Sequence, residues 1–284
     1  MSEMSIARRK LFMQIKPSSG WVAIRFKELW QFRDLMWSLA ARDLKVRYKQ
    51  TMLGVAWVVL QPLIQAGVLS IVFGGIAKLD RGDKPYNYFL LTFCGQLAWN
   101  TFGWTVTKAS DCLLSNAQLV SKVYFPRLVL PFSTVISTVV DVSVGIGMLA
   151  VLLIIFQLRP DLPILLLPMW MALLLLFGLG VGLIAAAMTV TYRDVKYVIP
   201  VAIQTLMFAS PVMWSMADAP DKWRWLLTLN PLAPLIEGLR YSLLHGAPSP
   251  PWHLVGISAG LAVGVFIYGL YQFKRMERRF ADVI

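Results

Sequence analysis

Charged side chains are scarce in this sequence of 284 residues. Asp, Glu, Lys and Arg make up 15% of the residues, whereas hydrophobic residues make up 57%. A soluble domain carries about a quarter charged residues, and a chain this apolar has too little polar surface to face water on all sides. The shortage of charge argues against a soluble protein and predicts an integral membrane protein.

Motifs for chemistry are also lacking. The sequence has no G-x-x-x-x-G-K-[ST] phosphate loop, so we expect no ATP binding of that kind in this chain. Its two histidines, His245 and His253, have no Cys, His or carboxylate at a metal-ligand spacing. Cys94 and Cys112 fall on one predicted helix and its end, roughly 27 Å apart, too far for a disulfide. We therefore expect no metal, no cofactor and no enzymatic activity in this chain.

Long uncharged runs recur along the chain. A hydrocarbon core about 30 Å thick requires about 20 apolar residues in a helix, and six runs reach that length, one of them interrupted by Asp141. The runs are residues 53–77, 86–107, 128–158, 162–192, 197–217 and 254–273. They predict an all-α integral membrane protein with six transmembrane helices. Its expected parts are a cytoplasmic N-terminal segment (1–52), a six-helix transmembrane domain (53–273) and a basic tail (274–284).

The positions of Lys and Arg predict the orientation, because cytoplasmic segments of membrane proteins are enriched in basic residues. Most of the 27 basic residues lie before the first run or on the same side of the membrane as that segment, and four directly follow the sixth run. We expect both termini in the cytoplasm. The net charge of +12 then reflects topology and contact with anionic lipid headgroups, and no motif supports nucleic-acid binding.

Residues 21–41 contain neither Gly nor Pro and predict an amphipathic helix. Trp21, Trp30 and Trp37 suit a helix in the headgroup layer, because an indole keeps its ring in the apolar zone and its N–H near water. Packing of this helix on a partner protein is the alternative.

Residues 218–252, between the fifth and sixth runs, hold one apolar stretch that is too short to span the membrane. Asn230 can cap a helix with Pro231 at its first position, and Gly246 can end it. The segment predicts a re-entrant or surface-lying helix on the outer side.

Polar side chains inside membrane helices are costly in lipid and are expected to face the bundle interior or water. Such residues recur here at helical spacing beside aromatic ones. The candidates for a channel lining are Trp57, Gln61, Gln65, Gln96, Asn100, Trp104, Gln204 and Phe208. In the second and third runs, hydrogen bonding between helices explains the pattern equally well. Asp141 is expected to have a structural partner, which the sequence does not identify.

Two series of spaced glycines, in the fourth and sixth runs, are expected to let helix backbones approach closely. They are Gly178, Gly180 and Gly182, and Gly256, Gly260 and Gly264.

Several short motifs follow one another along the chain. They are RDLKVRYK (42–49), LG (53–54), Trp57, QP (61–62), NA (116–117), KVYFPR (122–127), YRDV (192–195), SPVM (210–213) and NPL (230–232), the last continuing through Glu237 to Arg240. Together with six helices, they resemble the permease subunits of ABC transporters that export O-antigen, capsular polysaccharide or teichoic acid. The resemblance covers nearly the whole chain.

The resemblance implies a membrane subunit of an ATP-driven exporter that moves a lipid-linked, O-antigen-like polysaccharide across the cytoplasmic (inner) membrane of a bacterium. It implies a homodimer with the channel between the subunits, and two copies of a separate subunit that binds ATP and Mg²⁺. The residues implied in coupling to that subunit are Asn116, Lys122, Tyr124, Pro126, Arg127, Arg193, Asp194 and Lys196. The implied outer gate contains Asn230, Pro231, Glu237 and Arg240, of which Glu237 and Arg240 can pair on one helix face.

Two other interpretations stay open from the sequence. A related ABC permease that exports a drug or a lipid shares the helical pattern. A membrane enzyme that acts on a lipid-linked substrate requires clustered acids or histidines near one membrane face, and the sequence has no such cluster.

Overall fold

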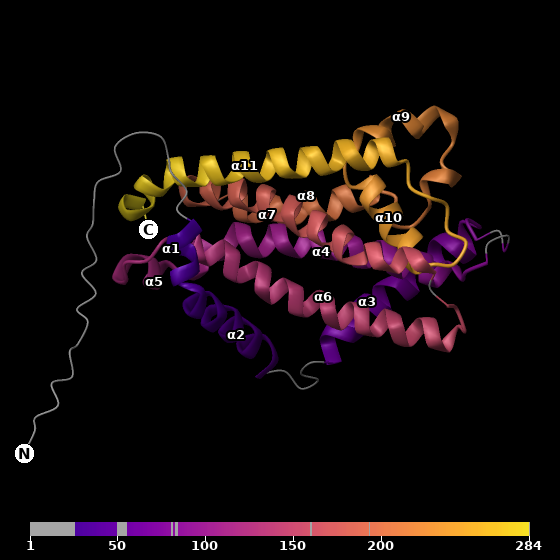
Figure 1. The fold of residues 1–284 in the computed structure, drawn as a ribbon, viewed down its shortest axis with the longest axis horizontal. Coiled ribbons are helices and arrows are strands. Elements are labelled where there is room, and N and C mark those ends of the chain that lie inside the picture. Colours follow the sequence, from indigo (N-terminus) through magenta and orange to yellow (C-terminus); the bar gives the residue numbers. More distant parts are fainter. Residues whose placement is uncertain are drawn as a thin grey trace, which may run out of the picture.

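The computed structural model of the protein describes residues 26–49, 56–80, 82, 85–159, 161–192 and 194–283. Every regular element within these ranges is a helix (Figure 1). In order, they are α1 Phe26–Gln31, α2 Arg33–Lys49, α3 Ala56–Leu69, η1 Ser70–Ile76, α4 Tyr88–Ser115, α5 Ala117–Lys122, α6 Val129–Ile155, η2 Leu162–Leu166, α7 Leu167–Thr191, α8 Val195–Phe208, η3 Met216–Asp218, α9 Asp221–Leu229, α10 Ala233–Leu243 and α11 Trp252–Val283. The all-helical prediction is confirmed for these ranges.

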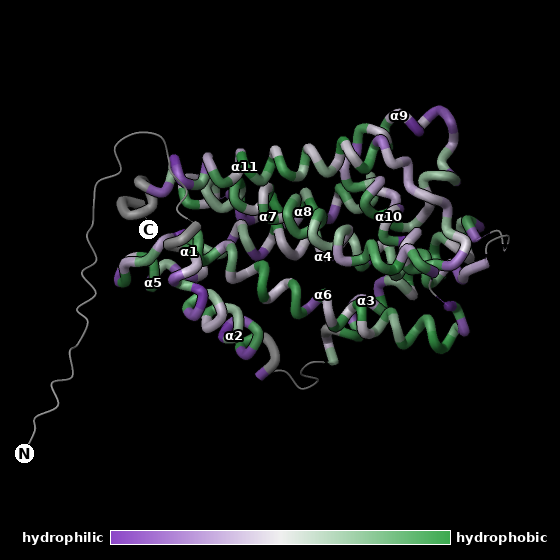
Figure 2. The backbone as a smooth tube through the Cα atoms, in the orientation of Figure 1, coloured by the Kyte–Doolittle hydropathy of each residue, from purple (hydrophilic) through white to green (hydrophobic). Residues whose placement is uncertain are grey.

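Four helical segments in the described part of the chain are long and apolar enough to cross a membrane. They are Val59–Ile76, Val129–Ile155, Leu162–Thr191 and Trp252–Glu277. They coincide with the first, third, fourth and sixth predicted runs. Hydrophobic residues dominate the middle of these helices, and hydrophilic residues gather near α1 and α2 at one end and near α9 at the other (Figure 2).

The second and fifth runs fold differently from the prediction. α4 has 28 residues, about 42 Å of helix, and continues past the uncharged run to Ser115, so that it includes Lys108. α8 has 14 residues, about 21 Å, and ends at Phe208 instead of continuing to residue 217. Pro211 explains this end, because a proline disfavours helical backbone at the residue before it. Length and composition alone support four membrane helices.

α4 forms the centre of the bundle, where residues 90–103 are all buried. α7 packs against it through glycines: a Cβ added at Gly178 lies 2.9 Å from Thr105 Cβ, and one at Gly182 lies 2.6 Å from Ala109 Cβ. The other side of α7 meets α11, since a Cβ at Gly180 lies 2.7 Å from the backbone nitrogen of Phe266. The close packing predicted for this glycine series is confirmed.

The corresponding prediction for α11 is wrong within this chain. A Cβ added at Gly256, Gly260 or Gly264 meets nothing within 4 Å. The close approach of α11 to α7 lies further along, where a Cβ at Gly269 is 2.5 Å from the carbonyl oxygen of Gly180. Spacing alone could not show which face of α11 turns toward the bundle.

The N-terminal segment predicted as a helix is helical in two pieces, α1 and α2, which are separated at Phe32. Leu29, Leu39 and Ala40 are buried, whereas Trp30 and Trp37 are exposed. The two indoles therefore point away from the chain's own core, as a position in a headgroup layer requires. Trp21 lies outside the described residues.

Candidate functional site

The candidate channel residues of α3 and α8 lie on the surface of the chain. Gln61 and Gln65 of α3 are exposed, and Trp57 retains 48% of its accessible surface. Phe208 of α8 retains 56%, and Gln204 is exposed as well. An exposed amide side chain is expensive in contact with lipid. The α3 face therefore requires either water or another protein surface against it.

The candidate residues of α4 lie inside the chain. Gln96 and Asn100 are buried, and Trp104 is partly buried. The Gln96 side-chain amide donates to Gln65 Oε1 and to Asn100 Oδ1, both at 3.2 Å. Gln65 is thus the point at which a buried polar chain on α4 reaches the exposed face of α3. This is the hydrogen bonding between helices that the sequence left as an alternative for the second run.

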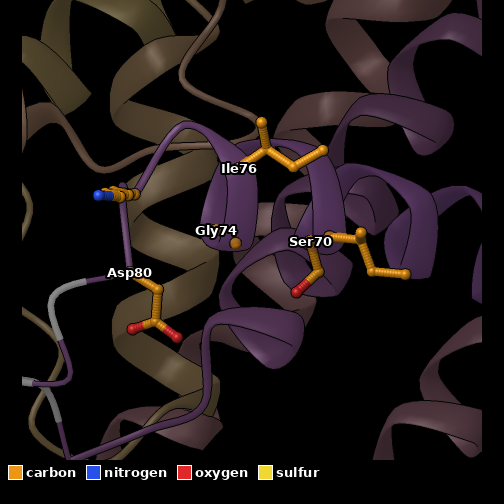
Figure 3. A pocket seen from close by; sticks show the side chains of 7 residues that line it. Ser70, Gly74, Ile76 and Asp80 are labelled. Carbon is orange, nitrogen blue, oxygen red and sulfur yellow. The ribbon is translucent and has the colours of Figure 1, made fainter.

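A hollow of about 590 Å³ opens beside η1, the π-helix that continues α3. Figure 3 shows Ser70, Gly74 and Ile76 on this helix and Asp80 on the segment that follows it. A π-helix carries an extra residue per hydrogen-bonded turn and is frequent at functional sites. The last part of this membrane helix therefore has an irregular surface.

In the half of the bundle away from η1, the structure identifies the partner of Asp141. The ammonium of Lys108 on α4 lies 2.7 Å from Asp141 Oδ2 on α6, and the Asp141 side chain is fully buried. Lys108 also donates to Ser137 Oγ at 3.4 Å. The sequence missed this ion pair because Lys108 lies beyond the uncharged part of the second run, where a loop was predicted.

Two coupling candidates are connected to the same half of α4. The Arg42 guanidinium of α2 donates to Asn116 Oδ1 at 2.6 Å, and Asn116 follows the last residue of α4. The Lys196 ammonium of α8 lies 3.2 Å from Asp111 Oδ1 of α4. α4 is thereby bonded to α2, α6 and α8 within its last three turns. Asp194 is exposed at the start of α8, and Arg193 lies outside the described residues.

The remaining coupling candidates are near α5. Lys122 ends α5, and both Lys122 and Tyr124 are exposed. Pro126 and Arg127 are partly buried. The Arg127 guanidinium donates to the carbonyl oxygen of Glu277 on α11 at 3.0 Å. This segment therefore presents an exposed tip that is anchored to the end of α11.

Two of the candidates for the outer gate, Glu237 and Arg240, form a buried network, whereas Asn230 and Pro231 are partly buried. The guanidinium of Arg240 lies 3.1 Å from Glu237 Oε1 on the same helix, α10. It also donates to the carbonyl oxygens of Leu91 at 3.2 Å, Trp214 at 2.9 Å and Val212 at 2.6 Å. Arg240 thus joins α10 to α4 and to the segment after α8, and the predicted pairing with Glu237 is present.

α10 is an inserted helix. Its residues from 233 to 240 are all buried, and the Trp170 indole of α7 donates to Ser242 Oγ at 2.8 Å. Asn230 Oδ1 accepts from the Leu232 backbone N–H at 3.0 Å, and the helix begins at Ala233, two residues after the predicted start at Pro231. It ends at Leu243, before Gly246. α10 is therefore packed inside the chain, whereas the helix before it, α9 Asp221–Leu229, is mostly exposed.

Among the described residues, no group of three or more His, Cys, Asp or Glu side chains is placed to hold a metal ion. The site has polar and aromatic residues on an exposed helix face, ion pairs toward one end and an inserted helix toward the other. These features define a multi-helix membrane protein.

Comparison with known proteins identifies the family. Residues 34–244 match the ABC-2 type transporter family. The match extends over more than half of the chain, and the chain belongs to that family.

The curated relatives cover most of the sequence. The O-antigen export system permease protein RfbA of Klebsiella pneumoniae is 27% identical over 252 residues, 88% of this chain and 95% of the relative. A protein with the same name from Myxococcus xanthus is 29% identical over 212 residues, 74% of this chain and 80% of the relative. The polysialic acid transport protein KpsM of Escherichia coli is 25% identical over 245 residues, 84% of this chain and 92% of the relative.

Proposed function

We propose that this chain is the membrane subunit of an ATP-driven exporter that moves a polysaccharide across the cytoplasmic membrane. The names of three relatives, each matching about three quarters or more of the chain, are the main support. The exposed face of α3 supports it independently, because Trp57 offers an apolar ring and Gln61 and Gln65 offer hydrogen bonds to a sugar chain.

The translocation path lies between two copies of the chain. Gln61 and Gln65 are exposed in one copy, and a second copy opposite them keeps the amides away from lipid. Gln204 and Phe208 of α8 lie on the chain's surface as well and complete the lining. Gln96 and Asn100 support the path from behind by holding Gln65 in place.

The chain spans the membrane six times, and α4 and α8 supply the two helices beyond the four apolar ones. α4 has the length to cross, and its polar residues are compatible with a membrane position because they are buried in protein. α8 crosses together with the segment after it, which Arg240 binds through Val212 and Trp214. Both termini lie in the cytoplasm, in agreement with the excess of basic residues there.

Two copies of a separate ATP-binding subunit dock at the cytoplasmic end and hydrolyse ATP. The exposed tip at Lys122 and Tyr124 is the first contact, and Asp194 and Lys196 are the second. Movement of either contact reaches the membrane helices through Asn116, bonded to Arg42, and through the Lys196–Asp111 ion pair. Such rigid links between packed helices transmit domain movements.

Deletion of the gene tests the export function. We expect lipid-linked polysaccharide to accumulate on the cytoplasmic side while the same polysaccharide disappears from the cell surface, and a plasmid copy to reverse both changes. Normal surface polysaccharide together with a changed resistance to drugs would contradict the cargo and favour a drug exporter.

Purification of the chain tests whether ATP is hydrolysed by a separate subunit. The chain alone is expected to hydrolyse no ATP, because its sequence has no phosphate loop. Robust ATP turnover by a preparation shown to contain no second protein would overturn the proposal.

A further inference from the structure

A second hollow lies between α2, α4 and α6, in the half of the bundle that holds the Lys108–Asp141 ion pair. Its volume is about 310 Å³. Polar side chains that line it include Asp43 of α2, Lys108, Asp111 and Ser115 of α4, and Thr134 and Ser137 of α6. Three helices thus build one polar pocket, and no role in transport accounts for it.

The α2–α4–α6 pocket presents both signs of charge. Lys108 supplies an ammonium that is held in place by Asp141 and Ser137. Asp43 accepts two hydrogen bonds from Arg42 through Oδ1, and Asp111 faces Lys196 through Oδ1. An ionised carboxylate has about four acceptor positions, so both acids retain capacity for a further donor.

This arrangement discriminates among ligands by charge. A pyrophosphate carries several negative charges and would meet the carboxylates of Asp43 and Asp111. A ligand with positive charge alone would meet Lys108. A ligand with one phosphate and one primary ammonium complements both sets of groups.

The depth of the pocket fits the headgroup region of a membrane. Lys108 lies seven residues, about 10 Å of helix, before the end of α4 at Ser115. The polar layer on each side of the hydrocarbon core is roughly 5–8 Å thick. Ser115 at the mouth then lies at headgroup level, and Lys108 lies below that layer, toward the hydrocarbon core, where its ammonium meets Asp141.

We propose that the α2–α4–α6 pocket binds the headgroup of a phosphoethanolamine lipid of the cytoplasmic leaflet, with the phosphate toward Lys108 and the ammonium toward Asp43 and Asp111. The choice of leaflet rests on the proposed function, which places this end of the bundle in the cytoplasm. A lipid held there connects α2, the helix that exposes Trp37, to α4 and α6.

Native mass spectrometry of the detergent-purified full chain tests this site, with phosphatidylethanolamine and phosphatidylglycerol of matched acyl chains as probes. We expect one phosphatidylethanolamine retained per copy, in preference to phosphatidylglycerol. The double variant Asp43→Asn/Asp111→Asn is expected to retain it about tenfold less, because two charge-assisted hydrogen bonds are weakened. Asp34→Asn is the matched control, since it makes the same change at an exposed position of α2.

Ser115→Leu is a second variant that narrows the mouth of the pocket at an exposed residue without changing charge. It is also expected to lower retention of phosphatidylethanolamine, with an unchanged unfolding temperature. Equal retention of both lipids, or retention unaffected by the double variant and by Ser115→Leu, would overturn the proposal. Either result would mean that the retained lipid surrounds the membrane helices without occupying this pocket.

The lipid measurement requires neither ATP nor polysaccharide, so a failed export experiment does not decide it. Labelling of a cysteine at position 115 from outside the cell would contradict the orientation, and with it the leaflet. Failure of the lipid proposal can therefore be distinguished from failure of the proposed export function.

Discussion

Lys108 on α4 and Asp141 on α6 form an ion pair with 2.7 Å between Nζ and Oδ2, inside a bundle of membrane helices. Asp141 is the one acid within the apolar runs of the sequence, and an unpaired carboxylate at that position would cost several kcal/mol. The pair removes most of this cost and fixes the position of α4 along α6.

Lys108→Met is expected to lower the free energy of unfolding by about 3 kcal/mol, because Asp141 then stays buried without its cation. The double variant Lys108→Met/Asp141→Leu is expected to recover most of the loss, since an apolar pair avoids the burial of both charges. Thermal unfolding of the purified chain measures both, and Lys122→Met on exposed α5 is the control. Equal losses in the single and double variants would mean that the pair is not an energetic unit.

Gly95→Ala is expected to destabilise the packing of α4 against α10 by about 1–3 kcal/mol. The added methyl would lie against the carbonyl oxygen of Val212 and 2.5 Å from Arg240 Nη2, so the guanidinium would have to leave its carbonyl partners. Gly147→Ala on α6 is the matched control because its Cβ meets nothing within 4 Å. A comparison of their unfolding temperatures checks the prediction, and similar values would show that Arg240 can move without cost.

Lys196→Glu is expected to reduce transport per ATP hydrolysed and to change stability by less than about 1 kcal/mol, because the ion pair with Asp111 is partly exposed. The charge swap Lys196→Glu/Asp111→Lys is expected to restore coupling. Transport and ATP hydrolysis measured together in the reconstituted exporter check this result. Failure of the swap, with both subunits still assembled, would indicate that Lys196 acts through the ATP-binding subunit alone.

The charge reversal Asp194→Arg is expected to abolish transport while the chain stays inserted in the membrane. Asp194 is exposed at the start of α8, so the substitution adds no buried charge. Membrane fractionation and the export assay check the two parts of the prediction. Undiminished transport would show that this segment is not a contact through which the ATP-binding subunit drives transport.

Hydrophobic length was enough to predict four of the membrane helices, because a 30 Å core sets a minimum that a sequence either meets or fails. It placed the boundaries of α6 and of the η2–α7 segment within a few residues. The cost of an unpaired carboxylate inside a membrane helix also predicted a partner for Asp141. It did not identify Lys108, because α4 continues for eight residues beyond its uncharged run and only the packing of α4 on α6 brings the two side chains together.

Contacts between distant segments were the hardest to predict. Arg240 was expected to pair with Glu237, three residues away, and this local relationship is present. Its bonds to Leu91, Val212 and Trp214 depend on the insertion of α10 between α4 and the segment after α8. Similarly, spacing put polar residues of α3 and α4 into comparable stripes, whereas packing exposes Gln61 and buries Gln96.

The path between two copies is tested most directly by cysteine accessibility along α3. Trp57, Gln61 and Gln65 are replaced one at a time in a background without Cys94 and Cys112, and the assembled exporter is treated with a membrane-impermeant thiol reagent. Val263 and Ile267 of α11, both exposed on the chain's surface, serve as controls on a helix that does not carry the polar stripe. We expect cysteines at 57, 61 and 65 to react and those at 263 and 267 to be protected. Equal protection of all five in a transport-competent protein would show that this face of α3 is packed and that the polysaccharide passes elsewhere.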